Sequence, residues 1–108
     1  MIRASTPEHT FELPFERDYL AKMVITYSQG EKPNHKIILE KTEADVVYDE
    51  SDPKVFSITL TQEETLLFDP ENSSAIIQIH ALTQNGKSIQ SEEIWVNIRD
   101  ARHTEVLE

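Results

Sequence analysis

The stretch AIIQIHALTQNGKSIQSEEIWVNIR (residues 75–99) contains two runs of alternating apolar side chains separated by a turn. Alternate side chains of a strand point to the same face, so each run can bury one face. The pair Asn85-Gly86 is typical of a type I′ hairpin turn, which needs positive φ at both central residues. We therefore predict a β-hairpin with one strand over residues 75–83 and a returning strand over residues 92–99.

The same period-two pattern recurs along the rest of the chain. It predicts strands around residues 10–13, 21–27, 36–41, 44–48 and 55–60, with turn-rich connectors SQGEKPN (28–34), DESDP (49–53) and DPENSS (69–74) between them. About seven strands spaced roughly ten residues apart indicate an all-β, immunoglobulin-like antiparallel β-sandwich; a partly open barrel is the alternative. We expect one domain over residues 1–108, with an ordered core from about 6 to 99 and a C-terminal tail at 100–108.

The segment LTQEETLLF (residues 60–68) interrupts the strand pattern with a helical turn near residues 61–67. Thr61 and Glu64 have the spacing of a capping box, in which each side chain binds the other residue's backbone amide. Adjacent helical residues point about 100° apart, so Glu63 and Glu64 do not converge on one substrate atom. We interpret both glutamates as structural, and we expect residues 66–68 to close the end of the sandwich.

The composition excludes several classes of function. The chain has 10 basic and 20 acidic residues, a formal charge of 10 − 20 = −10, which would repel nucleic acid and anionic membranes. It contains no cysteine, so thiol chemistry and thiolate metal sites are excluded. No segment has the ~20 apolar residues that a membrane-spanning helix needs. We predict a soluble protein that binds neither nucleic acid nor membranes.

The candidate chemical groups do not form a recognisable catalytic motif. The four histidines, His9, His35, His80 and His103, lack the spacing of metal ligands, and no serine lies in a nucleophile motif. We therefore predict no enzymatic activity, no cofactor and no metal. Two alternatives stay open: a ligand- or cation-binding module that uses the acidic residues of 49–52 and 69–72, and a small hydrolase with carboxylates from distant strands.

A non-enzymatic module would act through its surface, by a sheet face or an exposed edge strand. We name Tyr27, Trp95 and Arg99 as contact candidates. Trp95 falls opposite the predicted core face of its strand, where it either anchors an interface or packs under a neighbouring loop. Pairing of edge strands could also join two copies into a homo-oligomer.

The order of segments TPEHTFELPF, VITYSQ, IILEKT, LTQEETLLF and IQIHALTQNGKSI resembles a group of small uncharacterised proteins encoded among the structural genes of prophages in Gram-positive bacteria. The group is in turn remotely similar to the N-terminal β-sandwich module of phage baseplate upper proteins. The resemblance covers most of residues 6–99 and assigns no site residues. It implies a structural or assembly protein of a phage tail or baseplate, bound to other phage structural proteins. It also implies a location in the bacterial cytoplasm during assembly, with the virion as a further location.

Overall fold

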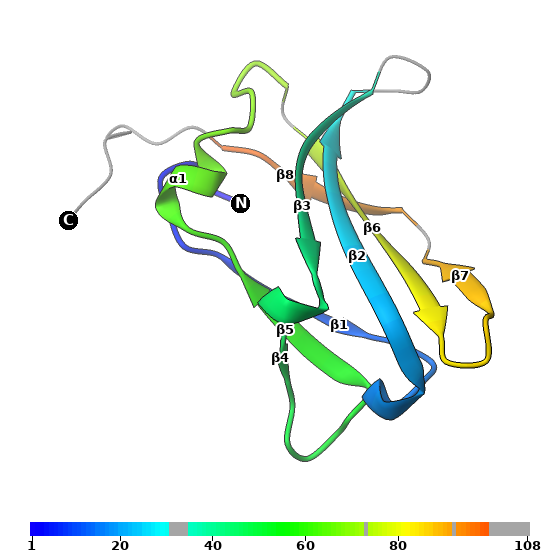
Figure 1. Cartoon of the computed structure of the whole chain (residues 1–108). Coiled ribbons are helices and arrows are strands. Elements are labelled where there is room, and N and C mark those ends of the chain that lie inside the picture. Colours follow the sequence, from blue (N-terminus) through cyan, green and yellow to red (C-terminus); the bar gives the residue numbers. More distant parts are fainter. Residues whose placement is uncertain (31–34, 73, 92, 100–108) are drawn as a thin grey trace.

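The computed structural model describes residues 1–30, 35–72, 74–91 and 93–99, whose strands form two antiparallel sheets that face each other (Figure 1). The smaller sheet has the strand order β1-β5-β4. The larger has the order β3-β2-β6-β7, and β8 pairs with β6 as well. The strands are β1 (Glu8–Glu12), β2 (Leu20–Gln29), β3 (Lys36–Thr42), β4 (Val47–Tyr48), β5 (Val55–Thr59), β6 (Ser74–Thr83), β7 (Ser88–Gln90) and β8 (Ile94–Asn97). The predicted antiparallel β-sandwich is confirmed.

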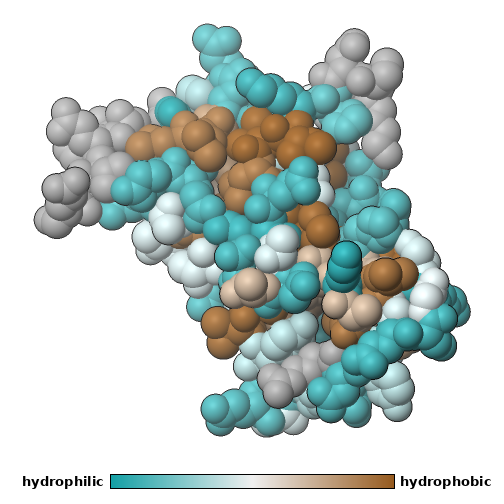
Figure 2. Space-filling view, viewed as in Figure 1, coloured by the Kyte–Doolittle hydropathy of each residue, from teal (hydrophilic) through white to brown (hydrophobic). Residues whose placement is uncertain are grey.

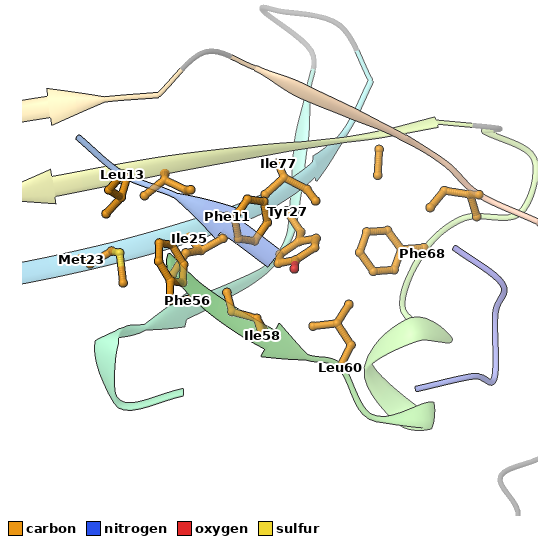
Figure 3. Packing of buried hydrophobic residues seen from close by; sticks show 13 residues of the cluster. Phe11, Leu13, Met23, Ile25, Tyr27, Phe56, Ile58, Leu60, Phe68 and Ile77 are labelled. Carbon is orange, nitrogen blue, oxygen red and sulfur yellow. The ribbon is translucent and has the colours of Figure 1, made fainter. Parts of the chain in front are cut away.

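The core lies between the two sheets and consists of the side chains that the alternation places on their inner faces (Figure 3). From β2, β5 and β6, fully or almost fully buried residues include Met23, Ile25, Tyr27, Phe56, Ile58, Ala75, Ile77 and Ile79. Burying one such large apolar side chain stabilises the fold by about 1.5 to 3 kcal/mol. The period-two pattern therefore predicted the buried face of each of these strands.

The returning side of the predicted hairpin contains two strands, β7 and β8. Both pair with β6, with His80 opposite Gln90 and Ile77 opposite Ile94. Three residue steps on β6 (80 − 77) therefore match four on the returning side (94 − 90), the mismatch of a β-bulge. Ser91 satisfies the backbone groups of Ile79 at this mismatch. Its backbone N–H donates to the Ile79 carbonyl (2.8 Å), and its Oγ accepts from the Ile79 N–H (2.9 Å). The predicted returning strand over 92–99 corresponds to β8, which is shorter than predicted, whereas β7 was not predicted.

The hairpin turn differs from the predicted type I′ turn. Positive φ occurs at Gly86 (86°) but not at Asn85. The Thr83 N–H donates to the Lys87 carbonyl (2.8 Å), and the Gly86 N–H donates to the Thr83 carbonyl (3.0 Å). The loop is thus longer than two residues, and a single left-handed glycine is enough to reverse the chain.

The predicted strand over residues 44–48 is shorter in the structure. Residues Glu43–Asp45 form a 3₁₀ turn (η2), and Asp45 Oδ2 accepts a hydrogen bond from the Thr42 N–H (3.0 Å). This local bond competes with strand pairing, so only the two residues of β4 pair with β5. A second 3₁₀ turn, η1 (Arg17–Tyr19), leads into β2.

The predicted helical turn is α1 (Gln62–Thr65), and its capping box is formed. Thr61 Oγ1 accepts from the Glu64 N–H (3.1 Å), and Glu64 Oε1 accepts from the Thr61 N–H (3.0 Å). Phe68 is buried at the end of the sandwich as predicted, but Leu67 is 58% exposed, so it does not help to close the core. The structural interpretation of LTQEETLLF is confirmed for the cap and corrected for Leu67.

The double substitution Thr61→Ala with Glu64→Ala should remove both cap bonds. We expect a loss of about 1 kcal/mol, which lowers the melting temperature by a few degrees. The control, Thr59→Ala with Glu63→Ala, changes two neighbouring exposed residues of the same types. A thermal melt followed by circular dichroism compares the two, and equal melting temperatures would refute the capping account.

The first residues of the chain belong to the fold. The Met1 ammonium group donates to the Asn97 carbonyl (2.6 Å), and the Arg99 N–H donates to the Met1 carbonyl (2.8 Å). Ile2 forms a parallel bridge with Arg99. Residues 1–3 therefore contact the end of the larger sheet, and the predicted tail at 100–108 lies outside the described residues.

Candidate functional site

Tyr27, one of the three contact candidates, lies inside the core. Its side chain has no exposed surface, and its ring packs edge-on against Phe68 with the centroids 6.1 Å apart (Figure 3). Its hydroxyl forms a hydrogen bond of 2.9 Å with His9 Nδ1. The proposal of Tyr27 as a contact residue is wrong, because its position in the strand places it on the same buried face as Met23 and Ile25.

The partly exposed His9 of β1 and the buried Tyr27 of β2 form a polar pair between the two sheets. Burial raises the pKa of Tyr27, and the carboxylate of Glu64 adds to the effect. Burial lowers the pKa of His9, and the positively charged N-terminus lowers it further. Both shifts favour neutral forms, as expected for a pair that joins two sheets.

The lowered pKa of His9 predicts a pH dependence of stability. The unfolded chain binds a proton at His9 near pH 6.5, and the folded protein binds it only at lower pH. The neutral form of His9 therefore stabilises the folded protein. This stabilisation is fully present above about pH 6.5 and is lost as the pH falls towards the folded-state pKa. We expect the melting temperature to fall from pH 7.5 to pH 5.5, and the fall to be smaller in His9→Gln. An identical fall in both proteins would contradict this.

Glu64 links α1 to the larger sheet through an ion pair with Lys41 of β3. Burial opposes the charge on Glu64, but hydrogen bonds from Lys41 and Thr61 outweigh it and lower the pKa of the carboxyl. A carboxylate with these partners is held as an acceptor. Glu64 therefore has a structural role. Among the described residues, no second carboxylate contacts it.

The acidic loops use their carboxylates to hold turns. Asp49 Oδ1 accepts from the Ser51 N–H (2.8 Å), and Asp52 Oδ1 accepts from the Lys54 N–H (3.0 Å). Asp69 Oδ1 accepts in the same way from the Glu71 N–H (2.9 Å). Within residues 1–30, 35–72, 74–91 and 93–99, no group of three or more histidine and acidic side chains is close enough to hold a metal ion. His103 lies outside this part of the chain.

Trp95 is paired with Ile76, and the residues on either side of Ile76, Ala75 and Ile77, belong to the core between the sheets. Alternation therefore places Trp95 on the outer face of the larger sheet. Ile37 of β3 is paired with Ser28, Ser28 with Ile76, and Ile76 with Trp95. Side chains at paired positions share a face, so these residues form one row across four strands. Trp95 is 62% exposed, which excludes the interpretation that it packs under a loop.

A hollow of about 490 Å³ lies beside this row. Its remaining lining includes Thr26, Gln78 and Glu93, together with Gly30 and His35. Such a volume falls in the range of ligand-binding clefts. We define the row and this lining as the Trp95 face.

Arg99 is exposed but lies outside the lining of this hollow. Its backbone binds the N-terminal segment: its N–H donates to the Met1 carbonyl (2.8 Å), and its carbonyl accepts from the Arg3 N–H (2.9 Å). Of the three predicted contact candidates, Trp95 alone lies in the Trp95 face. Glu93 and Thr26 were not predicted from the sequence, although Glu93 precedes Trp95 by two residues and so has the spacing of a same-face neighbour.

A second hydrophobic area lies on the open side of the sandwich, over α1, the N-terminus and the adjacent part of β3 (Figure 2). Ile2 and Leu67, which follows α1, are exposed, whereas Met1, Ile38 and Leu39 are partly buried against the core. Part of the hydrophobic surface in this region therefore also contributes to core packing. The Trp95 ring contrasts with it, because it makes no contact with another aromatic ring of the described residues.

No helix within the described residues is long and apolar enough to cross a membrane.

Comparisons with known proteins agree on the fold. No protein-family model and no curated protein sequence matches the chain. Among solved structures, it is similar to CopC from Methylosinus trichosporium OB3b, with a TM-score of 0.54, 10% identity and coverage of 94% of this chain and 85% of that chain. It is also similar to murine CRIg, with a TM-score of 0.51, 8% identity and coverage of 94% and 90%. At this level of identity, the similarity shows that the chain is an immunoglobulin-like β-sandwich and indicates nothing about its activity.

Proposed function

We propose that this chain is a non-enzymatic structural or assembly protein of a prophage tail or baseplate, and that it binds other phage structural proteins through the Trp95 face. The observation that supports this most directly is the row of Ile37, Ser28, Ile76 and Trp95 beside an open hollow. Tryptophan is enriched among the residues that dominate the binding energy of protein interfaces. The prophage setting rests on the sequence resemblance.

A face suits this role better than an edge strand. β3 has a free edge among the described residues, and it carries three charged residues: Lys36, Glu40 and Lys41. β1 carries Glu8 and Glu12 between two prolines, and the opposite edge of the larger sheet is broken by the bulge between β7 and β8. Charges, prolines and bulges of this kind hinder the addition of another strand. Self-association by edge pairing is correspondingly less favoured than contact through the Trp95 face.

The proposal is tested with particles from a strain whose prophage carries the gene. Tagged protein should sediment with purified particles, and Trp95→Ala should reduce this at least about tenfold, since a hot-spot residue contributes about 2 kcal/mol or more. The matched control is Tyr19→Ala, because Tyr19 is an equally exposed aromatic residue (61%) outside the Trp95 face. Equal sedimentation of both variants would refute the role of the face, and absence of the native protein from particles and from assembly intermediates would refute the setting.

A further inference from the structure

We infer that the hollow beside Trp95 binds an arginine side chain presented by the protein partner. This rests on the proposed function, since a protein partner supplies the arginine, and it names the chemistry by which the Trp95 face recognises that partner.

The indole of Trp95 gives the hollow an aromatic wall. Trp95 is 62% exposed, and it shares the lining of the hollow with Glu93. The face of an indole ring attracts a cation, and tryptophan is the best of the aromatic side chains for this purpose. A carboxylate beside the ring adds a charged partner for the same cation. Together, the two side chains favour a flat cationic group over an apolar or anionic one.

The lining of the hollow carries hydrogen-bonding groups that have no partner among the described residues. The hydroxyls of Thr26 and Ser28 are only partly exposed and form no hydrogen bond with the described residues. The side-chain amide of Gln78 donates to the Ser91 carbonyl (3.1 Å), which leaves its oxygen as an acceptor. A guanidinium group has five N–H donors and no acceptor. The hollow offers the complementary acceptors around one aromatic ring.

The charge of the described part of the site favours a cation. Among residues 1–30, 35–72, 74–91 and 93–99, no lysine or arginine lines the hollow, and Glu93 contributes a carboxylate to it. The whole chain has a formal charge of −10, so its field attracts a basic partner and repels an acidic one.

The apolar side chains and the planar shape select arginine over lysine. Ile37 and Ile76 lie in the same lining and can cover the methylene groups of a long side chain. A guanidinium group stacks on an aromatic ring and binds a carboxylate through two parallel hydrogen bonds, which a lysine ammonium group does not do. The hollow is large enough to hold the residues beside the arginine as well.

Fluorescence provides a direct readout, because Trp95 is the only tryptophan in the chain. The probe is acetyl-glycyl-arginyl-glycinamide, compared with the same peptide containing citrulline, the neutral analogue of arginine. We expect the arginine peptide to change the emission of Trp95 saturably at pH 7.5. We expect Glu93→Gln to raise the dissociation constant at least about tenfold. We also expect added salt to raise the dissociation constant. The control Glu50→Gln removes the same charge from an exposed loop and should leave binding unchanged.

Equal binding of the citrulline peptide, or equal affinity of Glu93→Gln and the native protein, would overturn the inference. So would saturable binding of a neutral sugar such as methyl glucoside without binding of the arginine peptide. If the arginine inference fails in one of these ways while Trp95→Ala still fails to sediment with particles, the Trp95 face contacts its partner by other chemistry and the proposed function stands. If the arginine peptide binds while Trp95→Ala sediments normally, the hollow is an arginine site and the proposed function fails.

Discussion

Replacing Phe56 with alanine is expected to lower the free energy of unfolding by about 3 to 5 kcal/mol, the largest effect of any single change considered for this chain. Phe56 is fully buried at the centre of the smaller sheet, on its middle strand β5. Its ring lies 5.5 Å from that of Phe11 and 6.0 Å from that of Tyr48, measured between centroids. Alanine would remove contacts with both neighbouring strands and leave a cavity between the sheets.

Denaturation by urea, followed by circular dichroism, measures this effect. The control is Val47→Ala on the neighbouring strand, where the side chain is 72% exposed and the change should stay within about 0.5 kcal/mol. If the alanine variant does not fold, Phe56→Leu fills more of the space and should cost roughly 1 to 2 kcal/mol. A loss below about 1 kcal/mol for Phe56→Ala would contradict the packing described for the core.

The second large effect is expected at Gln29, a buried amide at the end of β2. Gln29 Oε1 accepts from the Asp69 N–H (2.7 Å), and Nε2 donates to the carbonyls of Asp69 (3.1 Å) and Asn72 (3.2 Å). One side chain thus holds the connector that precedes β6. Gln29→Leu keeps the volume but leaves these backbone groups without their partner, at a cost of about 2 to 3 kcal/mol.

Gln29→Leu should change the local hydrogen bonding of the connector as well as the overall stability of the protein. Hydrogen exchange should show faster exchange of the Asp69 amide proton in Gln29→Leu, because its acceptor is gone. The control Gln90→Leu changes an exposed glutamine on β7 and should alter neither the exchange nor the stability by more than about 0.5 kcal/mol. Unchanged protection of the Asp69 amide would show that the connector is held by other contacts.

The buried faces could be predicted from the sequence wherever apolar residues alternate without interruption. This holds for β2, β5 and β6, and the spacing of Thr61 and Glu64 likewise predicted a cap that depends only on local geometry. Gln29 was missed because the pattern marks it only as a polar residue at an inward position. A polar residue that continues the inward-facing series Met23, Ile25 and Tyr27 indicates a buried hydrogen-bonded side chain, since a buried amide requires partners.

The additional strand β7 with its bulge before β8, and the Trp95 face, could not be predicted, because both depend on contacts between separate strands. The bulge arises from hydrogen bonds between Ser91 and Ile79, and a run of alternating residues does not reveal it. The face requires β3, β2, β6 and β8 to lie side by side, an order that no local pattern encodes. Alternation did place Trp95 opposite the core, but it could not show that Ser28, Ile76 and Ile37 are its neighbours.

We propose that the Trp95 face is an open binding surface of the free protein, and quenching of Trp95 fluorescence by acrylamide tests this most directly. The free protein should be quenched nearly as strongly as the urea-unfolded chain, because the indole is largely exposed. Saturation with the arginine peptide should reduce the quenching. A tryptophan that is already protected in dilute free protein, with blue-shifted emission, would show that the face is covered and would contradict the account.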